Sequence, residues 1–188
     1  MTLAVPLEEF NVHSLGLVQR ILVTTDGTLT DTLASIFLEP IELVKLAVTI
    51  TQSPQPIDAL ELEGGAKLMQ RQIVLRGKNS LSPYVYAEVQ IATDRLPPDL
   101  RNELLEGRLP LGTLWIMHRL EIFKERPRVR QRLAGDLAKH LGLREEDLLI
   151  ERSYRTFTNR RPVFIVSEYF PVDYAATAPD VGARQSSG

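Results

Sequence analysis

Two charged side chains fall in otherwise apolar rows of expected β-strands, which makes them candidates for chemistry. The stretch RPVFIVSEYFP, residues 161–171, reads as a strand, in which alternate residues face the same side. Glu168 then shares one face with three apolar residues, Phe164, Val166 and Phe170. A carboxylate among apolar groups loses its hydration unless a polar partner meets it. Glu168 therefore either ends the strand in solvent or faces a ligand.

The second charged residue of this kind is Arg71, in the expected strand AKLMQRQIVLRG, residues 66–77. The same alternation groups it with Met69, Ile73 and Leu75. Arginine is almost never fully buried without a partner, and its guanidinium fork suits a carboxylate. One interpretation is a direct ion pair with Glu168 inside the core. The other is a small-molecule site, in which Arg71 binds a ligand carboxylate and the glutamate meets a hydroxyl or proton farther along.

The elements expected to position these residues are two helices followed by strands that are mostly sequential in the chain. Sequential strands favour an antiparallel sheet with helices packed on it, which is an α+β fold. Helices are expected in 12–24, 25–40, 96–108 and 128–143, and strands in 41–53, 66–77, 84–94 and the second part of 109–125. A final hairpin around Asn159 is expected in 147–171.

Composition narrows the class of protein. The chain has 188 residues and a net charge of −2, which argues against a dedicated nucleic-acid binder. It has no cysteine, which excludes disulfides and thiol catalysis, and its three histidines do not show zinc-site spacing. No apolar run is long enough to span a membrane, and no signal peptide is visible. We expect one cytoplasmic domain over 1–172, compatible with a monomer, and a loosely ordered tail over 173–188.

Three motifs in order, RQIVLRG, LPLG and RPVFIVSEYFP, together with the upstream DGTLTDTL, resemble the chorismate pyruvate-lyase family. The resemblance covers roughly residues 12 to 172 and is strongest to the branch found in oxygenic phototrophs. It implies a six-stranded antiparallel sheet with helices enclosing a buried ligand cavity. It also implies that chorismate is split into 4-hydroxybenzoate and pyruvate without a cofactor or a metal.

The same resemblance assigns expected roles to four residues. It implies that Arg71 binds the ring carboxylate, that Glu168 meets the hydroxyl at the other end of the ring, and that Leu111 of the LPLG motif is a binding position. Leu29 stands where the family has a binding methionine.

The expected mechanism leaves the role of Glu168 open. In a dry apolar row, desolvation should raise the pKa of Glu168, so that it acts as a general acid, or it could orient the ring hydroxyl. Arg71 would fix the pose of the ring. The enolpyruvyl carboxylate of chorismate also needs a cation, for which Arg152 and Arg155 are the candidates.

Two other functions remain open at this stage. A non-catalytic sensor domain of the same fold would keep the cavity without needing both Arg71 and Glu168. A lyase acting on a related ring acid, such as isochorismate, would keep both Arg71 and Glu168. If the product is 4-hydroxybenzoate, it could enter ubiquinone or plastoquinone synthesis, and the phototroph-like resemblance favours plastoquinone.

Overall fold

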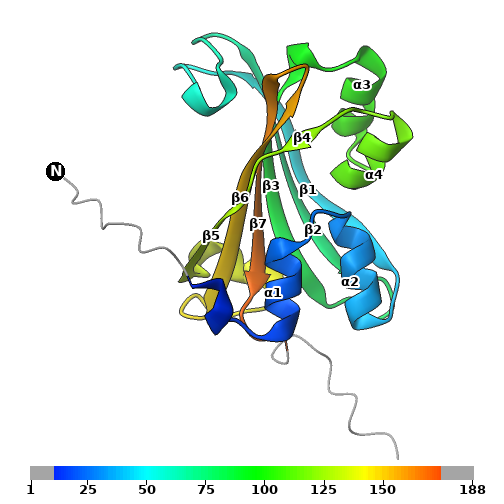
Figure 1. The fold of residues 1–188 in the computed structure, drawn as a ribbon, viewed down its shortest axis with the longest axis vertical. Helices are drawn as coiled ribbons and strands as arrows, with labels where there is room; N and C mark the ends of the chain where they lie inside the picture. The colour runs from blue at the N-terminus through cyan, green and yellow to red at the C-terminus, as the bar shows by residue number, and fades with distance from the viewer. Residues whose placement is uncertain (1–10, 175–188) are drawn as a thin grey trace, which may run out of the picture.

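The computed structural model describes residues 11–174, in which one antiparallel sheet of seven strands forms the frame (Figure 1). The hydrogen-bonded order is β1-β2-β3-β7-β6-β4, and β5 also pairs with β6. The strands are β1 (Ile41–Gln52), β2 (Lys67–Gly77), β3 (Pro83–Ala92), β4 (Phe123–Lys124), β5 (Arg128–Leu133), β6 (Leu148–Thr158) and β7 (Arg161–Pro171). The expected α+β class is confirmed, with one strand more than the resemblance implied.

Five α-helices accompany the sheet in the described part of the chain. They are α1 (Leu17–Thr24), α2 (Leu29–Phe37), α3 (Pro98–Glu106), α4 (Leu111–Met117) and α5 (Ala138–Leu141). Short 3₁₀ helices lie at Val12–Ser14, Asp58–Leu60, Thr93–Arg95 and Gly135–Leu137. No helix in residues 11–174 is long and apolar enough to cross a membrane.

Two helix pairs cover the same face of the sheet, one toward each end of the strands (Figure 1). α1 and α2 bury Leu22 and Leu33 in a cluster with sheet residues such as Phe170. α3 and α4 bury Leu104 and Leu114 in a second cluster with strand residues farther along that face. The short α5 packs on the opposite face. The first face is therefore covered at both ends, and its middle lies between the two pairs.

Two segments differ from the sequence prediction. Residues 109–125 were expected to form a turn and a strand, but they form α4 and only the two-residue strand β4. Residues 128–143 were expected to form one amphipathic helix, but the first part is strand β5. Its sequence RVRQRL alternates charged residues with Val129, which packs on the core, and β6 supplies a complete ladder of partners. Residues 128–133 therefore form a strand, because their alternation has a period of two and β6 offers hydrogen-bond partners, although the leucines of the whole segment have helical spacing.

The C-terminal hairpin is confirmed, and it contains an irregularity that matters for the site. Asn159 and Arg160 have positive φ angles of 49° and 62° and form the turn between β6 and β7. Next to the turn Thr158 pairs with Arg161, but a bulge at Thr156/Phe157 shifts the register by one residue. Beyond this bulge Arg152 pairs directly with Glu168.

The domain boundary expected at residue 172 stays a prediction. Most of the expected tail, residues 175–188, lies outside the described residues, as do residues 1–10.

Candidate functional site

A cavity of about 470 Å³ lies on the middle of the sheet face between the two helix pairs. Its floor consists of side chains from β2, β3, β7 and β6 that point to the same side. The strand pairing arranges them in two cross-strand rows. One row is Arg71, Val89, Val166 and Tyr154, and the next is Ile73, Ala87, Glu168 and Arg152. Most of the floor is apolar, with charged groups at separate positions.

The walls of the cavity come from three loop or helix segments. The turn between α1 and α2 contributes residues 26–30, α4 and the residue before it contribute 110–112 and 115–116, and the chain leading into β4 contributes several more. Leu29 and Leu111, the first residues of α2 and α4, both line the cavity, and their role as binding positions stays a prediction. A side chain at Gly112 would place its Cβ only 3.1 Å from Thr28 Cγ2, so the two walls meet closely at this glycine.

Arg71 is a buried cation without a carboxylate partner in residues 11–174. Its residue is 1 % exposed, its Nη2 donates to the Leu109 carbonyl at 2.6 Å, and its Nε has no hydrogen-bond partner. Burial lowers the pKa of the guanidinium to about 10, so it remains charged at neutral pH. The alternative of a direct Arg71–Glu168 ion pair is wrong, because Glu168 has a different partner.

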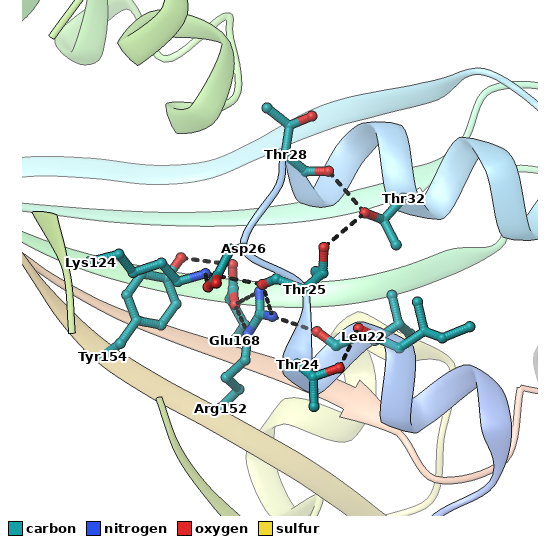
Figure 2. Close-up of polar contacts among 11 residues, drawn as sticks. Leu22, Thr24, Thr25, Asp26, Thr28, Thr32, Lys124, Arg152, Tyr154 and Glu168 are labelled. Carbon is teal, nitrogen blue, oxygen red and sulfur yellow. Dashed lines mark hydrogen bonds and ion pairs between the residues drawn. The ribbon is translucent and has the colours of Figure 1, made fainter. Parts of the chain in front are cut away.

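Glu168 is held by two residues of the neighbouring strand β6 (Figure 2). Arg152 Nε donates to Glu168 Oε2 at 2.6 Å, and Arg152 Nη2 forms an ion pair with the same oxygen at 2.5 Å. The Tyr154 hydroxyl donates to Glu168 Oε1 at 3.3 Å. Glu168 is buried and lines the cavity, so the alternative in which it ends the strand in solvent is wrong. Burial raises the pKa of Tyr154 well above its usual range, and so does the charge of Glu168, so this hydroxyl stays a donor.

The two arginines expected near a second carboxylate behave differently. Arg152 lines the cavity, but besides Glu168 it also donates from Nη1 to the carbonyls of Leu22 and Thr25. Arg155 alternates to the other side of β6, where its Nε contacts Glu125 at 2.7 Å, and it is not among the residues that line the cavity. The structure thus brings Arg152 to the site but not Arg155.

Lys124, on the short strand β4, is a cavity residue that the sequence analysis missed. Its Nζ donates to the Thr25 carbonyl at 3.2 Å and lies 3.8 Å from Asp26 Oδ1 and 4.4 Å from the centre of the Tyr154 ring (Figure 2). Burial and the neighbouring Arg152 charge lower the pKa of the amine. The sequence gives little indication of this position, because only the alternation of Ile122 and Lys124 within EIFKE places the two on one face. In the structure both residues line the cavity.

The charge of the lining is positive. Four cationic side chains and two carboxylates line the cavity, which gives a net charge of +2. They are Arg71, Arg119, Lys124, Arg152, Asp26 and Glu168. A pocket with an apolar floor and this charge suits an anionic small molecule that carries two carboxylates. Residues 11–174 contain no group of three or more side chains that could hold a metal ion.

Arg71 and Glu168 lie far enough apart to bind opposite ends of a ring. Glu168 is two strands away from Arg71 across the sheet and two residues away along it. With about 4.8 Å between strands and 3.4 Å per residue, their Cα atoms are about 12 Å apart. Both side chains line the same cavity, so the guanidinium and the carboxylate lie at separate positions on its floor.

Fold and cavity together define an α+β domain of the chorismate lyase-like class, with a positively charged cavity on one face of the sheet. The model of the family Chorismate pyruvate-lyase Rv2949c-like matches residues 23–177, and the chain belongs to this family. The chorismate pyruvate-lyase of Mycobacterium tuberculosis is 30 % identical over 168 residues, covering 87 % of this chain and 84 % of that protein. The chorismate pyruvate-lyase of Mycobacterium leprae is 33 % identical over 155 residues, covering 80 % and 72 %. The resemblance to the branch of oxygenic phototrophs stays a prediction.

Solved structures with the same fold include the ligand-binding domain of a putative GntR-family transcriptional regulator from Bordetella bronchiseptica, with a TM-score of 0.56 at 20 % identity over 71 % of this chain and 86 % of that domain. PhnF from Mycobacterium smegmatis superposes with a TM-score of 0.64 at 13 % identity over 79 % of this chain, which spans only 65 % of that protein. The C-terminal domain of the histidine utilization repressor from Pseudomonas syringae pv. tomato gives 0.58 at 16 % identity, over 70 % of this chain and 91 % of that domain. At these identities the similarity shows the fold alone.

Proposed function

We propose that this chain is a chorismate pyruvate-lyase, which converts chorismate into 4-hydroxybenzoate and pyruvate without a cofactor. The observation that carries the proposal is Arg71, a buried guanidinium that lines the cavity and has a free Nε. A buried charge without a counter-charge is costly, so a guanidinium in the wall of a cavity is best explained by an anionic ligand. The family membership supplies the class of that ligand.

Arg71 binds the ring carboxylate in the proposed complex, and the ring extends over the apolar floor toward Glu168. The floor residues between them, Val89, Ala87 and Val166, are small or branched and leave room for a flat ring. The hydroxyl on the far side of the ring then reaches Glu168. Two fixed ends and a flat floor hold the substrate in one orientation, and this orientation lowers the entropic part of the barrier.

The reaction itself is an elimination. The bond between the ring carbon and the enolpyruvyl oxygen breaks, and the adjacent ring carbon, which carries the hydroxyl, loses its hydrogen. The ring becomes aromatic, and the enolpyruvyl group gains a hydrogen at its methylene carbon to become pyruvate. Because aromatisation supplies much of the driving force, the residues of the site need mainly to position the two reacting carbons.

Glu168 orients the ring hydroxyl as an acceptor in this proposal, and it does not act as a general acid. Arg152 and Tyr154 both donate to its carboxylate, which is the arrangement that a charged carboxylate needs in a buried site. Oε1 accepts a hydrogen bond from the Tyr154 hydroxyl at 3.3 Å, and a carboxylate oxygen can accept a second one, here from the ring hydroxyl. The product would serve as an aromatic precursor for a quinone, plastoquinone or ubiquinone.

The test is to mix the purified protein with chorismate and quantify 4-hydroxybenzoate by chromatography and pyruvate by a coupled assay. Arg71→Met should lower kcat/KM about 100-fold, chiefly through KM, because a charge-assisted contact of about 3 kcal/mol is lost. Arg76→Met is the matched control, because Arg76 lies on the same strand but pairs with Glu42 outside the cavity.

Equal amounts of both products, reduced by Arg71→Met and unchanged by Arg76→Met, would support the proposal. Intact chorismate, with a protein that still binds 4-hydroxybenzoate, would refute the lyase and favour a sensor. Turnover of isochorismate in place of chorismate would refute the proposed substrate. A normal KM in the Arg71→Met variant would show that Arg71 does not bind the ring carboxylate.

A further inference from the structure

The proposed substrate carries a second carboxylate, and the structure offers a cation for it that the family motifs do not include. The enolpyruvyl group is attached to the ring carbon next to the one that carries the hydroxyl. If the hydroxyl contacts Glu168, the second carboxylate must lie near Glu168 and far from Arg71. Its partner should therefore be a positive side chain in the cavity wall at that end, with hydrogen-bonding capacity left.

Three of the four cations in the lining do not meet this requirement. Arg71 is assigned to the ring carboxylate. Arg152 already donates to Glu168, Leu22 and Thr25 through all three of its nitrogens. Arg119 is exposed to solvent on the segment that follows α4, and a charge in water gives a weaker contact.

Lys124 meets the requirement. Its side chain is 15 % exposed, and its amine lies 4.4 Å from the centre of the Tyr154 ring, whose hydroxyl contacts Glu168. Its one ion-pair partner in the described part of the chain is Asp26, at 3.8 Å, and the Asp26 side chain is 88 % exposed. Such a pair is weak, so a ligand carboxylate inside the cavity competes well for the amine. The three donors of an ammonium also allow Lys124 to keep its bond to Thr25.

We propose that Lys124 binds the enolpyruvyl carboxylate of the substrate, and that Arg71 and Lys124 together select a ring acid with two carboxylates. This inference rests on the proposed function. The net charge of +2 in the lining matches the two negative charges of such a substrate. The product 4-hydroxybenzoate has only the ring carboxylate, so it contacts Arg71 but not Lys124. Lys124 therefore contributes to substrate binding and not to retention of the aromatic product.

The experiment compares KM for chorismate with Kd for 4-hydroxybenzoate in four variants. Lys124→Met should raise KM about 10- to 100-fold, the usual effect of removing one charge-assisted hydrogen bond, while Kd changes less than about twofold. Lys124→Arg should restore most of the affinity. Asp26→Asn removes the competing carboxylate and should lower KM. Lys78→Met, at an exposed lysine of the β2–β3 turn, is the matched control and should leave both constants unchanged.

The outcomes separate this inference from the proposed function. A wild-type protein that does not convert chorismate refutes the proposed function itself. A wild-type protein that does convert it, with a Lys124→Met variant of unchanged KM, overturns only the role of Lys124. Parallel losses of substrate and product affinity in Lys124→Met would indicate a structural role and would also overturn the inference.

Discussion

The buried pair of Arg152 and Glu168 allows a prediction of stability that does not depend on any substrate. Arg152 is 1 % exposed and Glu168 is 6 % exposed, and the two strands place them directly opposite each other. Arg152→Met leaves the carboxylate buried without its cation, and the breaking of a buried pair in this way costs about 3–5 kcal/mol. The carbonyls of Leu22 and Thr25 also lose a donor. The loss is a large fraction of the 5–15 kcal/mol of a typical domain.

The measurement is urea-induced unfolding, followed by circular dichroism and by the fluorescence of the single tryptophan, Trp115. We expect Arg152→Met to lower the free energy of unfolding by about 4 kcal/mol and Tm by about 8–16 °C. Arg144→Met is the control, because the Arg144 side chain is 74 % exposed and forms a surface pair. It should change stability by less than about 0.5 kcal/mol.

The double variant Arg152→Met with Glu168→Gln tests the reasoning. If the cost comes from an unpaired charge, removing that charge as well should recover part of it, with a coupling of about 1–3 kcal/mol. A double variant whose loss equals the sum of the two single losses would refute the argument. So would an Arg152→Met protein within about 1 kcal/mol of wild type.

Two further predictions concern Glu39, which contacts the turn between β2 and β3, and the cavity wall. Glu39 accepts hydrogen bonds from Ser80 and Tyr84, and these bonds lower its pKa from 4.5 to about 2. The charged Glu39 therefore stabilises the fold fully above pH 4.5, and this contribution is lost as the pH falls toward 2. In urea unfolding, Glu39→Gln should be about 1 kcal/mol less stable than wild type at pH 7, and the difference in stability should be smaller at pH 3. An equal deficit at both pH values would contradict this. Gly112→Val adds bulk where Thr28 is already close, so chorismate KM should rise severalfold in steady-state assays, and an unchanged KM would show that the wall can yield.

The alternation of strand residues predicted which side chains share a face of β2 and of β7. Met69, Arg71, Ile73 and Leu75 do share a face of β2, and Glu168 does lie in an apolar row of β7. This part is predictable because a side-chain period of two depends only on the local backbone. The positions of Leu29 and Leu111 followed from the family resemblance instead.

The partner of Glu168 was not predictable in the same way. A regular hairpin with the turn at Asn159 and Arg160 would place Glu151 opposite Glu168. The bulge at Thr156/Phe157 moves the register by one residue and brings Arg152 there instead. No local pattern in the sequence marks this bulge, and a shift of one residue exchanges the two faces of a strand.

Lys124 was missed for a different reason. The strand that carries it has only two residues, too few to show a reliable alternation. Its contact with the cavity depends on how α4 and the following loop fold back over the sheet, which is a matter of tertiary packing. The error at 128–143 has the same origin, because β5 needs β6 beside it before its alternating arginines become a strand.

The bond from Arg152 to the Leu22 carbonyl joins residues 130 positions apart in the chain. The guanidinium belongs to the last hairpin of the described residues, and the carbonyl belongs to their first α-helix. During synthesis the helix has no such donor until the C-terminal hairpin has emerged and paired. The charged end of the cavity is thus among the last parts of residues 11–174 that can assemble, and binding of a ring acid there would report that the first helix and the C-terminal hairpin have both reached their native positions.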